Sequence, residues 1–150
     1  MTRLRTNTDF GLAVLRIITG TIFVAHGAQK LFVYGLDGVA GGFAQMGIPF
    51  PTIVGPMVGV LEFVGGLALI AGLLTRLAGT GLAINMLGAF LLVHLPAGFF
   101  MPKGYEFVMM LAASAITLVL SGAGSYSIDA LIARRREPAP FQRRELRRAA

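Results

Sequence analysis

Two histidines and a carboxylate are the residues of this chain best suited to proton or ligand chemistry. His26 lies in the first apolar segment, His94 at the end of the third, and Glu106 at the start of the fourth. Imidazoles and a carboxylate that converge can hydrogen-bond a quinone carbonyl, relay protons or hold a metal ion. The Glu-x-x-His pairs that di-metal helix bundles use are absent from the sequence, which disfavours a metal or haem site. The alternative interpretation, that these residues are interfacial and bonded to loop backbone, stays open.

A second constellation joins Arg16 and Glu62, which are charges deep inside apolar segments. A lone carboxylate near the middle of a bilayer costs several kcal/mol or stays protonated. Because a long arginine can reach along a helix bundle, we predict an Arg16–Glu62 ion pair. In the alternative interpretation Glu62 carries protons or contacts a ligand headgroup, with Asn85 as a further polar partner. Lys30 is another ligand candidate, unless it only extends its ammonium group to the membrane interface.

The helix that carries these groups gathers its charges on one side. At 100° per residue, the side chains of Arg16, Thr19, Phe23, His26 and Lys30 fall within an arc of about 80°. The opposite face is apolar and suited to lipid. Ionisable groups turned inward within a membrane usually mark a functional site or a buried pair.

The composition is that of a membrane protein. Of 150 residues, 55% are hydrophobic and 13% charged, and the mean hydropathy is +0.75. Soluble domains carry about twice that share of charge. At about 20 apolar residues per span, the chain has room for four spanning helices, short loops and a tail. Cysteine is absent, so the chain itself can supply no thiolate ligand.

The hydropathy pattern predicts an all-α protein, a bundle of four transmembrane helices in one domain over residues 1–133. The segment 33–51 is rich in glycine and proline, so we expect the longest non-helical connection there, with at most a short turn near Gly42 to Met46. The expected helices are 10–32, 52–74, 77–95 and 105–121.

The basic charge lies mostly in a tail. Residues 134–150 hold seven arginines and two glutamates, so we expect a disordered segment drawn to anionic lipid headgroups and no nucleic-acid binding. Arg3, Arg5 and Arg76 lie on the same side, which by the positive-inside rule places both termini in the cytoplasm. Arg16 then lies in the cytoplasmic half and Glu62 near the midplane, and the other ionisable candidates (His26, Lys30, His94, Glu106) lie toward the outer interface.

The sequence resembles the DoxX family of bacterial four-helix membrane proteins. The resemblance covers nearly all of Phe10 to Leu131 and is carried by RIITGTIFVAHGAQKLF (16–32), GIPFP (47–51), GVLEFVGGLALIAGLLTRLAG (59–79), LVHLPAGFF (92–100) and GYEF (104–107). It implies a four-helix inner-membrane fold and, for some relatives, membership of quinone-linked redox assemblies, including thiosulfate oxidation.

Two classes of function follow. The first is a membrane subunit or accessory of a quinone-linked redox system with a redox partner protein, in which His26, Glu62, His94 and Glu106 line a pocket. The second is a non-catalytic scaffold or small-molecule carrier, in which the same groups are structural. No motif identifies the substrate, the oligomeric state or the partner, or decides whether the chain is an enzyme.

Overall fold

The structure is a computed structural model that describes residues 2–136, and every regular element in that range is helical. The first helix, α1 (Thr2–Ala28), continues as a π-helical turn over Gln29–Tyr34. The chain then bends at Gly35, whose φ of 71° is in the region that glycine adopts without strain, and forms α2 (Gly35–Gln45).

The remaining helices are joined by short connections. After α3 (Pro51–Ala71) comes α4 (Thr75–Ala89), which is extended by a π-helical turn (Phe90–His94) and a 3-10 turn (Leu95–Ala97). A loop leads to α5 (Glu106–Ser121), and α6 (Ile128–Arg136) follows a second bend.

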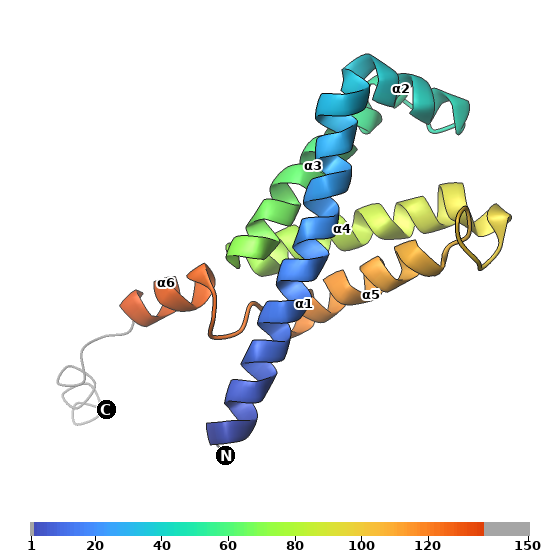
Figure 1. Ribbon diagram of the computed structural model, residues 1–150. Helices are drawn as coiled ribbons and strands as arrows, with labels where there is room; N and C mark the ends of the chain where they lie inside the picture. Colours follow the sequence, from blue (N-terminus) through green and yellow to red (C-terminus); the bar gives the residue numbers. More distant parts are fainter. Residues whose placement is uncertain (1, 137–150) are drawn as a thin grey trace, which may run out of the picture.

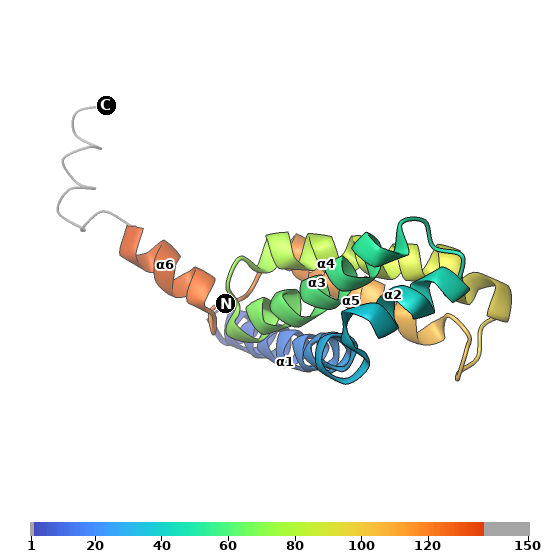
Figure 2. The same cartoon turned by 90° about the horizontal axis from the view of Figure 1, so that it is seen from above.

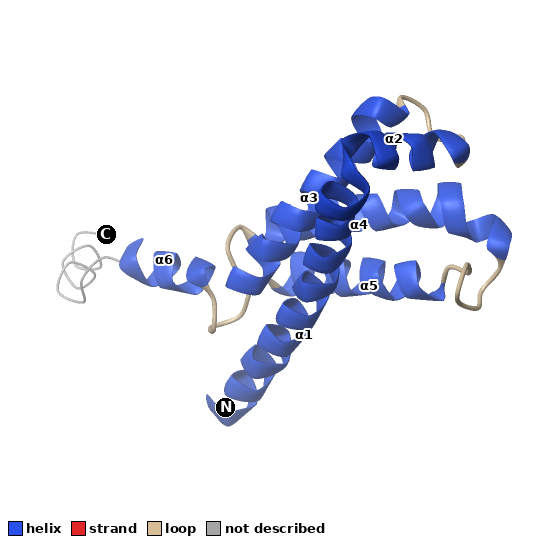
Figure 3. Cartoon of the chain, turned by 45° about the horizontal axis from the view of Figure 1, so that its top comes forward, coloured by secondary structure: helices blue, strands red, loops and turns tan. Residues whose placement is uncertain are grey.

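The long helices form two crossing pairs. Figure 1 shows α1 beside α3 and α4 beside α5, and these are also the helices that pack most closely. Seen from above, α6 leads away from the bundle on the side of the N-terminus (Figure 2). The pairs diverge toward α2 and the loop before α5, as Figure 3 shows. The two helix pairs are therefore farther apart at the end where α2 lies, and a cavity lies between them there.

Glycines allow the α1–α3 pair to pack closely. A Cβ atom added at Gly20 would lie 2.7 Å from the carbonyl oxygen of Gly66, and one added at Gly66 would lie 2.7 Å from that of Gly20. Helices in lipid gain little from burial between them, so close backbone packing of this kind stabilises their contact. The core below the opening is apolar and centres on four fully buried side chains, Phe23, Leu69, Leu82 and Leu118.

The helices have the length and composition of a membrane protein. Within the described residues three helical stretches are long and apolar enough to cross a bilayer: Thr6–Gln45, Pro51–Ala71 and Thr75–Ala97. The fourth long helix, α5, is apolar but has only 16 residues. Their outward faces carry many exposed large apolar side chains, as a lipid-facing surface requires.

The expectation of a non-helical connection over 33–51 is wrong for most of its length. Residues 35–45 form α2, although five of these eleven residues are glycine or aspartate, which have low helix propensity. Its Val39 is 4% exposed and packs over Gly55, and this burial outweighs the low helix propensity of glycine. The helix expected at 10–32 also begins earlier, at Thr2. Most of the expected tail, residues 137–150, lies outside the described residues.

Candidate functional site

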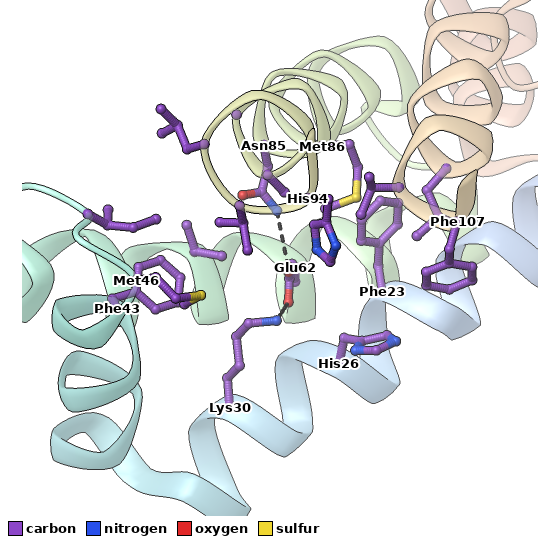
Figure 4. A pocket seen from close by; sticks show the side chains of 18 of the residues that line it. Phe23, His26, Lys30, Phe43, Met46, Glu62, Asn85, Met86, His94 and Phe107 are labelled. Carbon is purple, nitrogen blue, oxygen red and sulfur yellow. Dashed lines mark hydrogen bonds and ion pairs between the residues drawn. The ribbon is translucent and has the colours of Figure 1, made fainter. Parts of the chain in front are cut away.

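A partly enclosed cavity of about 540 Å³ lies where the helix pairs diverge. Its walls come from α1, α3, α4 and α5, and residues of α2 and of the loops after α2 and before α5 complete the lining. Figure 4 shows how the labelled side chains face this space. Most of the lining is apolar. The polar side chains in the lining are His26, Lys30, Glu62, Asn85 and His94.

Glu62 is the most deeply held of these polar groups. Its Oε2 accepts a hydrogen bond from Lys30 Nζ at 2.5 Å, and its Oε1 accepts one from Asn85 Nδ2 at 3.1 Å. The side chain of Glu62 is 5% exposed and that of Lys30 is 21% exposed. Three elements therefore meet in one charge-compensated cluster: α3 supplies the carboxylate, α4 the amide, and the π-helical turn after α1 the ammonium group.

The predicted Arg16–Glu62 ion pair is wrong. Arg16 is 2% exposed and donates from Nη2 to the carbonyl oxygen of Tyr126 at 2.5 Å, near the opposite end of the bundle. Its Nε and Nη1 have no hydrogen-bond partner among the described residues. Lys30 takes the place beside Glu62, and as one half of this buried pair it still lines the cavity as a ligand candidate.

The two histidines line the same cavity, as expected. His94 Nδ1 lies 2.8 Å from the carbonyl oxygen of Lys103. A carbonyl only accepts, so Nδ1 carries a proton in this contact, which makes Nε2 an acceptor whenever the ring is neutral. The His26 ring lies beside Phe107, with ring centroids 6.0 Å apart and planes tilted by 48°.

Glu106 does not join the histidines in the cavity, which corrects its expected place there. Its Oε1 accepts a hydrogen bond of 2.7 Å from the backbone N–H of Met101, and the side chain lies in a shallower depression on the other side of Phe107. At the first turn of α5 this carboxylate stabilises the loop before the helix and the positive end of the helix dipole.

The arrangement suits a small neutral headgroup with an apolar tail. Ligand pockets typically have volumes of about 300–1,000 Å³ and apolar walls with a few polar groups, and this cavity matches both features. Lys30 and Asn85 supply donors, and Glu62 and His94 supply acceptors. Over residues 2–136, no three His, Asp or Glu side chains lie close enough together to hold a metal ion.

These features define an all-helical membrane protein with a polar cluster inside an apolar cavity. The chain belongs to the DoxX family, whose family model matches residues 11–95. This range covers α1 from Gly11 onward together with α2, α3 and α4, and it contains all five polar residues that line the cavity.

Curated relatives match over most of the chain. "Putative oxidoreductase CatD" of Bacillus subtilis is 30% identical, over 83% of this chain and 88% of its own. An uncharacterized membrane protein of Mycobacterium tuberculosis is 33% identical, over 81% of this chain and 80% of its own. The inner membrane protein YqjF of Escherichia coli is 32% identical, over 83% and 93%. No solved structure matches the chain.

Part of the cavity was not expected from the sequence. Phe43, Met46 and Ile48 line it from α2 and the loop that follows, in the segment expected to be a connection without a role in the site. A weak signal was present, because apolar residues recur through this glycine-rich stretch at Val39, Phe43 and Met46, with the spacing of one helix face.

Proposed function

We propose that this chain is a membrane subunit of a quinone-linked redox system and that the cavity binds the quinone headgroup. The observation that carries the proposal is the Lys30–Glu62–Asn85 cluster inside an otherwise apolar cavity. The name of the Bacillus subtilis relative, "Putative oxidoreductase CatD", points to the same class of function.

The cavity residues fit both redox forms of such a ligand. A quinone offers two carbonyl acceptors, and a quinol offers two hydroxyl donors. Lys30 uses one of its three N–H bonds on Glu62, so it retains donor capacity for a carbonyl. Each oxygen of Glu62 accepts one hydrogen bond from the protein and has a further lone pair for a hydroxyl. The apolar walls suit an isoprenoid or alkyl tail.

Electrons have to come from, or go to, a partner protein in this proposal. The chain has no cysteine with which to hold an iron–sulfur cluster or form a redox disulfide. The residues of this chain bind and orient the headgroup, and Glu62 and His94 hold protons for it.

We further propose that α1, α3, α4 and α5 each cross the bacterial inner membrane and that both termini are cytoplasmic. The excess of arginine at the end of the chain that carries α6 supports this orientation. At about 1.5 Å per residue α5 is about 24 Å long, and the loop before it completes the crossing. Reporter fusions after Arg136 should read as cytoplasmic and fusions at Gly38 as periplasmic; the reverse pattern would contradict the orientation.

The binding proposal is tested by photolabelling with an azidoquinone in nanodiscs. We expect saturable labelling of peptides that line the cavity, competition by decylubiquinone, and at least a tenfold loss of labelling in Lys30→Met. Lys103→Met is the matched control, because Lys103 is exposed and its side chain does not line the cavity. Mass spectrometry of the lipid extract of the purified protein should also detect a quinone. Unsaturable labelling and a quinone-free extract would leave the scaffold or carrier alternative.

A further inference from the structure

We propose that water and protons reach the Lys30–Glu62 pair only from the side of the membrane on which α2 lies. This inference rests on the proposed function, because it states which compartment exchanges protons with the quinone site. It is supported by a contrast between the two directions along the bundle from Glu62, one toward α2 and the other toward the chain termini.

Toward α2, the cavity offers an open and partly polar route. His26 and His94 line the same cavity beside the buried pair, with His26 next to Phe107 of α5. Met46 and Met101 also line the cavity and are 44% and 54% exposed, so we place its mouth between them. Figure 4 shows the Lys30 and Glu62 side chains meeting within this space. Water that enters between these two loops can therefore approach the pair.

Toward the chain termini, the bundle is closed by packed apolar side chains. Phe23 from α1, Leu69 from α3 and Leu82 from α4 are at most 1% exposed, and Leu111 and Ala112 of α5 complete the same cluster. Among the described residues, the buried polar side chain between this cluster and Arg16 is that of Thr19. A single hydroxyl among close-packed apolar groups provides no continuous route for water.

A second closure lies beyond the first, at the end of the bundle near the termini. Arg16 fills the space beside Gly72 so tightly that a Cβ atom there would overlap its guanidinium group. Tyr126 accepts the hydrogen bond from Arg16, and Asp129 accepts from the backbone N–H groups of Leu74 and Thr75. These contacts hold the residues before α6 and the first turn of α6 against this end of the bundle. About ten residues of α3, or about 15 Å, separate this closure from Glu62.

One-sided access determines which compartment exchanges protons with the quinone site. Reducing a quinone to a quinol consumes two electrons and two protons, and the reverse reaction releases them. The electrons pass to or from the redox centre of the partner protein. The charged or titratable groups around Glu62 are Lys30, His26 and His94, whereas α5 faces the cavity with the apolar Phe107, Val108 and Leu111. Both protons therefore exchange with the compartment on the α2 side.

Single cysteines test the access route directly, because the natural chain has none. Val58→Cys and Ala89→Cys place a thiol in the cavity wall, and Ala83→Cys and Ala112→Cys place one in the apolar closure. A membrane-impermeant methanethiosulfonate reagent is added to right-side-out and to inverted vesicles. The exposed variants Asp37→Cys and Arg134→Cys report which face of the membrane each preparation presents.

We expect the two cavity thiols to react at least tenfold faster from the side that labels Asp37→Cys, and the two closure thiols to react from neither side. Reaction of the cavity thiols from the side that labels Arg134→Cys would overturn the inference. It would also fail if the closure thiols reacted as fast as the cavity thiols, or if the cavity thiols reacted from neither side. Size-exclusion profiles establish that each variant is folded.

Decylubiquinone separates this inference from the proposed function. If both hold, the compound slows labelling of Val58→Cys and Ala89→Cys and leaves labelling of Asp37→Cys unchanged. One-sided labelling without protection by the compound would uphold the access route and refute the quinone site. Protection together with labelling from the other side would uphold the quinone site and refute the access route.

Discussion

Removing Lys30 should destabilise the protein more than removing its partner. In Lys30→Met the carboxylate of Glu62, with a side chain only 5% exposed, keeps the hydrogen bond from Asn85 but loses its countercharge. Leaving one member of a buried ion pair uncompensated costs about 3–5 kcal/mol. The protein escapes part of this cost only by protonating Glu62, so we expect a value within that range.

The reciprocal change should be milder. In Glu62→Gln the amide oxygen can still accept one hydrogen bond, and Lys30 is 21% exposed and can turn toward the mouth of the cavity. Losing one charge-assisted hydrogen bond of this kind costs about 1–2 kcal/mol. The double variant Lys30→Met/Glu62→Gln leaves no uncompensated charge, so its loss should be smaller than the sum of the single losses by about 2–3 kcal/mol.

Unfolding in mixed micelles of increasing dodecyl sulfate content, followed by far-UV circular dichroism, measures all four states of this cycle. A parallel cycle with Arg16→Met and Glu62→Gln is the control, and it should be additive because Arg16 contacts Tyr126 instead. Additivity in the Lys30 cycle, or coupling in the Arg16 cycle, would refute the pairing on which the site is built.

Two further predictions concern the contacts that support the site. Asp129→Ala removes both acceptors from the first N–H groups of α4 and should lower the free energy of unfolding by about 1–2 kcal/mol, whereas Asp37→Ala on exposed α2 should change it little; the same micelle titration checks both. Gly66→Ala should cost about 1–3 kcal/mol and lower the midpoint of thermal unfolding, because its Cβ would lie 2.7 Å from the carbonyl oxygen of Gly20. A Cβ atom at Gly11 would have nothing within 4 Å, so Gly11→Ala should stabilise α1 slightly through the higher helix propensity of alanine; equal effects at both glycines would contradict the close α1–α3 contact.

The long helices could be predicted from the sequence because each is an apolar run bounded by turn residues. The helices expected at 52–74 and 105–121 correspond to Pro51–Ala71 and Glu106–Ser121. Helix α2 could not be predicted in this way, because its glycines argue against a helix and only tertiary burial of Val39 on α3 favours one. The cavity residues that α2 and the next loop contribute were missed for the same reason.

The polar residues that line the cavity could be predicted from the sequence, but which of them contact each other could not. Inward-facing His26, Glu62, Asn85 and His94 all line the cavity, because ionisable and amide groups avoid lipid wherever a protein interior is available. Which groups meet depends on how far two helices slide past one another. Helix periodicity gives the angle of a side chain around its axis but not its height against a neighbouring helix, so the angular argument alone could not choose between Arg16 and Lys30.

The glycines of α1 and α3 indicate how far the two helices are shifted along each other. Gly20 and Gly27 are seven residues apart, as are Gly59 and Gly66, and in the structure Gly20 contacts Gly66 while Gly27 contacts Gly59. In an antiparallel pair this register places Glu62 level with about residue 24 of α1. Lys30 is then about six residues, or about 9 Å, from that level in one direction, and Arg16 about eight residues, or about 12 Å, in the other.

The direction in which each side chain leans explains why Lys30 and not Arg16 pairs with Glu62. A side chain on a helix leans toward the N-terminus of its own helix, so Lys30 leans down toward the level of Glu62 and Arg16 leans away from it. The extended Lys30 side chain spans the shorter distance and contacts Glu62. Arg16 lies near the end of the bundle and donates a hydrogen bond to the carbonyl oxygen of Tyr126. Matched glycine spacings on two helices, combined with this lean, therefore give the ion-pair register that the positions of the charges alone do not.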